Sequence, residues 1–178
     1  MTVNTSQSTD RATEARDSGS DETITTDSGN VWRSLKSLFR REKKVAIIID
    51  GPNLLRKIGK KQIKVEDIDQ VAEKIGSISS RYILLNHHAS NKLIEAMLNS
   101  GYSPIVERGD IYVRLTMKGI EALHRSKVDV LLIGSRDARV VPLLMAAREK
   151  GVETAIVGFD PGFSIALKNV ADYAFELR

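Results

Sequence analysis

Two aspartates follow apolar runs whose composition is typical of buried strands. Asp50 ends the run 45–50 (VAIIID), and Asp137 comes shortly after the run 128–133 (VDVLLI). Asn53 stands three residues beyond Asp50, so its carboxamide can enter the same cleft. If the two strands are neighbours in a parallel sheet, the carboxylates converge at one edge, where they repel unless a cation or a proton separates them. The spacing predicts a magnesium or manganese site, in which the ion polarises a phosphoryl oxygen and lowers the pKa of a bound water.

The residue types and motifs that are absent narrow the chemistry. The 178 residues include no cysteine, which excludes disulfides, thiolate zinc sites and thiol nucleophiles. Three histidines are too few for a histidine-rich metal site, so a divalent ion needs oxygen ligands. The sequence has no phosphate loop and no GxGxxG after the first strand, which argues against a nucleoside triphosphatase or a nicotinamide enzyme. No apolar run is long enough to span a bilayer and no secretory signal opens the chain, so we expect a cytoplasmic protein.

Each candidate taken alone also has a purely structural explanation. An aspartate after a buried strand often caps the next helix, and Asn53 can do the same. His88 follows the run 82–86 (YILLN) and is expected at the same edge of the sheet as Asp50. There a histidine can act as a general acid or contact phosphate, although turn and cap hydrogen bonds explain such a residue more often. It is the combination of residues and their order that favours a site.

The elements that must position these residues alternate in type from residue 45 onward. Apolar or alternating runs predict strands at 45–50, 82–86, 104–107, 110–115, 128–133, 154–158 and 173–177. Helical spacing and helix stop signals predict helices at 54–60, 65–75, 91–98, 116–124, 138–150 and 164–169. This alternation predicts an α/β fold, a three-layer α/β/α sandwich with a central, mainly parallel sheet. Right-handed crossovers then place ligand sites at the carboxyl ends of the strands.

Charge is distributed unevenly along the chain. The formal net charge is +4, but residues 1–30 hold six acidic residues against two arginines, so the remainder carries +8. Residues 1–30 have almost no large apolar side chains and are expected to form a disordered acidic tail. Residues 31–44 form a basic amphipathic segment that contains Arg40 and Arg41. This segment can pack on the domain, bind a phosphate backbone or lie on an anionic membrane surface, and the basic domain that follows favours nucleic acid as the partner.

Three segments of the sequence resemble the motifs of one family. The segment IIIDGPN, ending at Asn53, is similar to the opening motif of NYN domains, the PIN-like nucleases that include the LabA-like proteins. The segment VDVLLIGSRDARVVPLLMAAREKG resembles that family's strand followed by SGDxDFxPL, and SIALKNVADYAFEL resembles its closing pattern. The resemblance covers residues 44–178 and points to an archaeal-type branch. It implies a PIN-like sandwich, magnesium or manganese as the cofactor, and cleavage or binding of RNA.

The resemblance carries over only to the positions that match. Asp50 and Asn53 match the first motif, and Ser135 and Asp137 match the Ser and first Asp of the second. The segment Lys118–Glu121 (KGIE) resembles the family's KGxD helix start, with Glu121 in place of the aspartate. By resemblance, Asp50, Asn53, Asp137 and Glu121 are the candidate catalytic residues, and Asp50 and Asp137 are the metal ligands.

The sequence also departs from the family pattern. Arg139 stands where the second aspartate of SGDxDF belongs, and the further aspartate expected after KGxD is absent near Lys127. Arg136 and Arg139 can bind phosphate together with a helix N-terminus, or both can point to solvent. The candidate nucleic-acid-binding residues are Arg136, Arg139, Ser135, His88, Arg40 and Arg41. The leading hypothesis is a metal-dependent ribonuclease-like domain acting on RNA. Because two acidic positions of the family pattern are missing, the sequence does not decide whether the site is catalytically active. A catalytically inactive RNA-binding or scaffold module on the same fold is the alternative.

Overall fold

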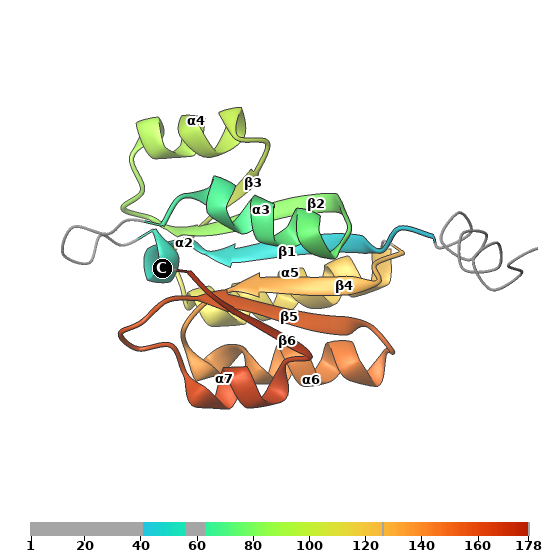
Figure 1. Cartoon of the computed structure of the whole chain (residues 1–178). Helices are drawn as coiled ribbons and strands as arrows, with labels where there is room; N and C mark the ends of the chain where they lie inside the picture. Colours follow the sequence, from blue (N-terminus) through green and yellow to red (C-terminus); the bar gives the residue numbers. More distant parts are fainter. Residues whose placement is uncertain (1–40, 56–62, 126, 178) are drawn as a thin grey trace, which may run out of the picture. The chain divides into compact units, whose positions relative to one another are not determined.

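A six-stranded sheet forms the centre of the domain (Figure 1). The computed structural model describes residues 41–55, 63–125 and 127–177, and these form a unit that begins at Arg41. The strands are β1 (Lys44–Asp50), β2 (Ser77–Asn86), β3 (Ser103–Glu107), β4 (Val130–Gly134), β5 (Glu153–Gly158) and β6 (Tyr173–Glu176). Their order in the sheet is β3-β2-β1-β4-β5-β6, and all neighbouring pairs are parallel. The prediction of a mainly parallel sheet is confirmed.

The chain reverses its direction of winding between β1 and β4. After β1 it builds β2 and β3 on one side, then returns to the centre and builds β4, β5 and β6 on the other. In such sheets the crevice at the carboxyl ends of the two central strands is where ligands bind. The register pairs Ile49 with Gly134, so the residues that follow both strands lie at the same edge.

Helices cover both faces of the sheet (Figure 1). The side chains of β1 alternate between the faces: Ile47 and Ile49 belong to one buried cluster, and Ala46 and Ile48 belong to the other. The first cluster is completed by α3 (Val65–Ile75) and α4 (Asn91–Asn99). The second is completed by α5 (Ile111–Arg125), α6 (Val141–Glu149) and α7 (Ile165–Val170). Because every residue of 45–50 is buried, β1 reads as a continuous apolar run rather than an alternating one.

One predicted strand is wrong. Residues 110–115 are not a strand but the start of α5, which continues through the helix predicted at 116–124. The Asp110 carboxylate accepts a hydrogen bond of 2.7 Å from the Tyr112 backbone N–H, which is an aspartate's usual role at a helix start. Leu115, Gly119 and Ala122 are buried at helical spacing, and this longer period prevails over the short alternation at the beginning of the segment.

The segments around β1 differ in part from expectation. Lys44 opens β1, so the amphipathic segment predicted at 31–44 does not extend to its last residue as a helix. The acidic tail 1–30, Arg40 and most of the predicted helix 54–60 lie outside the described residues. A short helix, α2 (Gly51–Leu54), follows β1 directly, with Asp50 as its N-cap. Within the described part of the chain, no helix is long and apolar enough to cross a membrane.

Candidate active site at the carboxyl edge of the sheet

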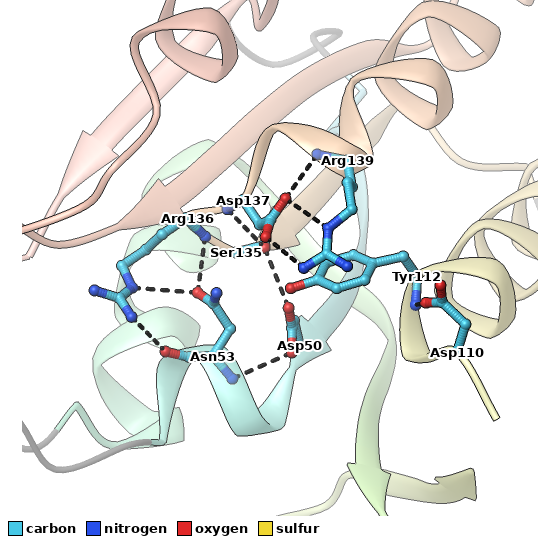
Figure 2. Close-up of polar contacts among 8 residues, drawn as sticks. All are labelled: Asp50, Asn53, Asp110, Tyr112, Ser135, Arg136, Asp137 and Arg139. Carbon is cyan, nitrogen blue, oxygen red and sulfur yellow. Dashed lines mark hydrogen bonds and ion pairs between the residues drawn. The ribbon is translucent and has the colours of Figure 1, made fainter. Parts of the chain in front are cut away.

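Asp50 is the central residue of the edge where β1 and β4 end. Its side chain is only 1 % exposed, and it opens on a hollow of about 200 Å³. One carboxylate oxygen accepts a hydrogen bond of 3.2 Å from the Asn53 backbone N–H, and the other accepts one of 3.4 Å from the Ser135 hydroxyl (Figure 2). The hollow is lined by Asp50, Pro52, Asn53, Ile111, Tyr112 and Arg136.

The surroundings of Asp50 make its negative charge costly. Burial raises the pKa of the Asp50 carboxyl above its ordinary value, and the charge of Asp137 raises it further. Hydrogen bonds, with Tyr112 as the strongest contributor, lower this pKa but do not cancel the rise. No ion pair between Asp50 and a basic side chain is present within the described residues. A buried carboxylate in this state favours either a proton or a cation in the hollow.

Asp137 has the opposite environment. It caps the short 3-10 helix η1 (Ala138–Val140), and its Oδ1 accepts hydrogen bonds from the backbone N–H of Arg139 at 2.9 Å and from Nε of the same residue at 3.0 Å. Its Oδ2 accepts a third, of 2.7 Å, from Arg139 Nη2. These bonds lower the pKa of Asp137 to about 2, so the carboxylate is ionised at neutral pH.

Ser135 connects the two aspartates. Its hydroxyl oxygen accepts a hydrogen bond of 3.2 Å from the Asp137 backbone N–H while its hydrogen is donated to Asp50. Figure 2 shows Asp50, Ser135 and Asp137 gathered between the end of β1 and the start of η1. The sequence-based prediction that these side chains share one edge of the sheet therefore agrees with the geometry.

Arg136 fixes the orientation of the Asn53 carboxamide. The Asn53 Oδ1 accepts hydrogen bonds from the Arg136 backbone N–H at 3.0 Å and from its Nε at 3.2 Å. The two Nη atoms donate to the backbone oxygens of Asn53 at 3.3 Å and of Pro161 at 2.6 Å, and the guanidinium lies 4.4 Å from the Phe159 ring centre. Because Oδ1 is used twice, the amide nitrogen faces the side of Asp50 (Figure 2). Asn53 thus presents donors to the hollow, and Arg136 acts on the site through Asn53.

The motifs and their placement now identify the family. The NYN domain family matches residues 44–178. The chain belongs to this family. The NYN domain implies the fold of PIN-like nucleases, and the site described above lies within the matched residues.

Two proteins illustrate the similarity of this NYN domain to others. The chain is 34 % identical over 157 residues to the uncharacterized protein MJ0482 of Methanocaldococcus jannaschii, covering 83 % of this chain and 65 % of that protein. The chain therefore spans less than two thirds of the length of this curated relative. A crystal structure of a protein of unknown function from Vibrio parahaemolyticus, VPA0982, is similar with a TM-score of 0.67 and 19 % identity. The similar region covers 78 % of this chain and 95 % of the Vibrio chain. At 19 % identity this similarity supports the assignment of the fold and nothing about function.

Glu121 does not lie where the family motif predicts. The resemblance predicts Lys118–Glu121 at the start of a helix. In the structure this segment lies in the middle of α5, which begins after Arg108-Gly109-Asp110. Nine residues separate Glu121 from Tyr112, a rise of roughly 13 Å along a helix. Glu121 pairs with Lys118 at 3.3 Å, and among residues 41–55, 63–125 and 127–177 no three acidic or histidine side chains gather as a metal site. Glu121 as a third carboxylate of the site is therefore not supported.

The remaining predicted binding residues are dispersed over the NYN domain. His88 is exposed in the turn after β2, at the carboxyl edge, and its ring contacts the His87 ring, with centroids 3.8 Å apart and planes tilted by 42°. Arg41 lies at the opposite edge, where its Nη2 contacts both oxygens of Asp129 at 2.9 and 2.7 Å. It is thus not part of the hollow around Asp50.

Tyr112 is a site residue that the sequence did not reveal. It lies in the first turn of α5 and lines the hollow, and its hydroxyl lowers the pKa of both Asp50 and Asp137. Burial and the charge of Asp50 raise its pKa, so its hydroxyl stays protonated and serves as a donor. Because the sequence predicts residues 110–115 as a strand, it offers no reason to place Tyr112 at the carboxyl edge of the sheet.

The role of the Asn53 amide can be tested with an isosteric change. Asn53→Asp keeps the oxygen that Arg136 requires, but it replaces the NH₂ donor with an acceptor beside Asp50. We expect the affinity for a nucleic-acid oligonucleotide, measured by fluorescence anisotropy, to fall by about tenfold or more, because a donor to a charged phosphate is lost. The matched control is Asn99→Asp, which adds the same charge at an exposed position of α4. Equal losses in the two variants would assign the effect to net charge and contradict the donor role.

Proposed function

We propose that this NYN domain is a metal-dependent ribonuclease that acts on RNA with one Mg²⁺ or Mn²⁺ held by Asp50 and Asp137. The observation that carries the proposal is Asp50: a buried carboxylate without an ion-pair partner in the described part of the chain, facing a hollow that also receives hydrogen-bond donors. The excess of +8 in the chain beyond residue 30 supports a polyanionic substrate.

The oxygen atoms available at this edge fit a single hard cation. Mg²⁺ usually keeps several waters and takes one or two carboxylates from the protein. Asp50 supplies one carboxylate, and its two hydrogen bonds of 3.2 and 3.4 Å leave lone pairs toward the hollow. Asp137 can add one oxygen, since its Oδ2 accepts one hydrogen bond from Arg139 whereas its Oδ1 accepts two. The oxygen of Asn53 is occupied by Arg136, so we do not assign it as a ligand.

The protein groups around that position have distinct tasks. When bound, the cation supplies polarisation of a phosphoryl oxygen and a coordinated water of lowered pKa. The Asn53 amide nitrogen donates a hydrogen bond to a non-bridging oxygen of the phosphodiester, and the Arg136 guanidinium holds that amide in place. The Tyr112 hydroxyl keeps its proton and lies beside both carboxylates, where it lowers the pKa of each. The burial of Asp50 at the floor of the hollow strengthens these electrostatic contacts.

A second candidate function rests on Arg139. Its guanidinium already neutralises Asp137, and a site that holds a guanidinium where the family has a carboxylate can bind a phosphate backbone without cleaving it. In this case the domain is an RNA-binding or scaffold module.

Incubation with RNA distinguishes the two candidates. Single-stranded and structured RNA are incubated with Mg²⁺, Mn²⁺ or a chelator, and products are resolved on denaturing gels. We expect metal-dependent cleavage that falls by about 100-fold or more in Asp137→Asn, because a metal ligand is lost. The matched control is Asp129→Asn, which removes an aspartate paired with an arginine in the same way but at the opposite edge. Salt-sensitive binding without cleavage would favour the module, and the absence of both would contradict either function.

A further inference from the structure

Asp137 already forms an ion pair with the Arg139 side chain. The Arg139 guanidinium approaches it in a two-pronged arrangement, with Nε at 3.0 Å from Oδ1 and Nη2 at 2.7 Å from Oδ2. One face of this guanidinium lies on the Tyr112 ring, with Cζ 3.7 Å from the ring centre. Although the Arg139 side chain is 60 % exposed, these contacts hold its guanidinium between the first turn of α5 and η1 (Figure 2). Planar bidentate pairing with stacking gives arginine a defined position that a lysine would not have.

We propose that the Arg139 guanidinium takes the place of a second metal ion, so that this domain binds one divalent cation at Asp50 and none that is centred on Asp137. This inference rests on the proposed metal-dependent function and deepens it. Many nucleases and phosphatases use two ions 3.5–4 Å apart as a clamp on the phosphoryl group. Here one of the two positive charges would be covalently attached to the chain.

The charge of the site agrees with one ion and not with two. The formal charges of Asp50, Asp110, Asp137, Arg136 and Arg139 sum to −1. One divalent ion brings the sum to +1, which matches a single phosphodiester charge. Two ions would bring it to +3, an excess that a single phosphodiester charge does not compensate.

Manganese binding to the whole chain tests this inference independently of cleavage. Bound Mn²⁺ is counted by isothermal titration and by the electron paramagnetic resonance signal of the free ion. We expect one ion in the wild-type protein, and about tenfold tighter binding in Arg139→Gln because both Asp137 oxygens become available. Arg139→Asp is expected to add a second ion, since it supplies a further carboxylate at the same place. Arg139→Lys keeps the positive charge but loses the bidentate pairing with Asp137. Its Mn²⁺ affinity should lie between that of the wild type and that of Arg139→Gln.

A matched control separates the site from net charge. Arg148→Gln removes the same charge from an exposed arginine that pairs with Asp172 at 3.9 Å, and its Mn²⁺ binding should equal that of the wild type. Unchanged affinity in Arg139→Gln, or a single ion in Arg139→Asp, would overturn the inference while the Asp50 site stands. One bound ion without RNA cleavage would instead refute the proposed ribonuclease and leave the inference intact. No Mn²⁺ in any of these variants would refute both.

Discussion

Asp50→Asn is expected to abolish metal-dependent RNA cleavage and, at the same time, to raise the melting temperature of the protein. The loss of activity follows from the proposed role of Asp50 as metal ligand, because within the described residues no group of three acidic or histidine side chains offers another site. The stability rises because burial raises the pKa of Asp50, so its ionised form is unfavourable in the folded state. An asparagine has the shape of the protonated carboxyl without its charge. Such an exchange of stability for function is common at active sites.

The direction in which the stability gain of Asp50→Asn changes with pH also follows from the raised pKa of Asp50. The folded-state pKa of Asp50 is above the unfolded value of 3.8, so folding favours the protonated form. Its contribution to stability is therefore greatest below pH 3.8 and is lost as the pH rises through the folded-state pKa. The difference in melting temperature between Asp50→Asn and wild type should be small near pH 4 and grow toward pH 7. We expect a gain of a few degrees, since about 1 kcal/mol corresponds to roughly 2–4 °C at this chain length.

Metal addition provides the complementary measurement. Mn²⁺ should raise the melting temperature of the wild type, because a ligand that binds only the folded state stabilises it, and it should have no such effect on Asp50→Asn. If Asp50→Asn melts at a lower temperature than the wild type at pH 7, the claim that the ionised Asp50 side chain destabilises the folded state is contradicted. Retained cleavage would contradict the assignment of Asp50 as ligand.

The position of Asp50 and Asp137 could be predicted from the sequence for a simple physical reason. Parallel strands covered on both faces must be apolar along their whole length, so 45–50 and 128–133 stand out as strands without any other information. Right-handed crossovers then leave only one edge where the residues after both strands can meet. The register of β1 and β4 agrees with this inference.

The contacts that complete the site depend on tertiary packing and were not predictable in this way. The start of α5 is decided by burial of Leu115 and Ala122 farther along the helix, so Tyr112 could not be placed from its own neighbours. The KGxD resemblance misplaced Glu121 because a short motif carries no information on where the helix begins. Arg136 reads as a phosphate ligand in sequence, whereas the carbonyl oxygen of Pro161 and the Phe159 ring hold it inside the fold.

Gly51→Ala is expected to have the second large effect, because this glycine sets the distance between β2 and the helix that carries Asn53. A Cβ at this position would lie 2.5 Å from the backbone oxygen of Leu84 and 2.7 Å from Leu85 Cδ2. A leucine side chain can change its rotamer, but the oxygen of Leu84 belongs to a central strand hydrogen-bonded to its neighbours. Relief therefore requires α2 to move away from β2. This movement would shift Asn53 relative to Asp50 and to Arg136.

We expect Gly51→Ala to lower the free energy of unfolding by about 2–3 kcal/mol, as overpacking in a dense interior does, and to reduce RNA cleavage at temperatures where the protein remains folded. Urea denaturation measures the first effect, and cleavage rates at a temperature well below the midpoint measure the second. Gly109→Ala is the control, since its Cβ would meet only Glu107 Oε1 at 3.4 Å, an ordinary contact just before α5. Its stability should change by less than about 0.5 kcal/mol. Similar unfolding free energies for the two variants would show that the close approach of Gly51 to Leu84 and Leu85 does not hold α2 in place.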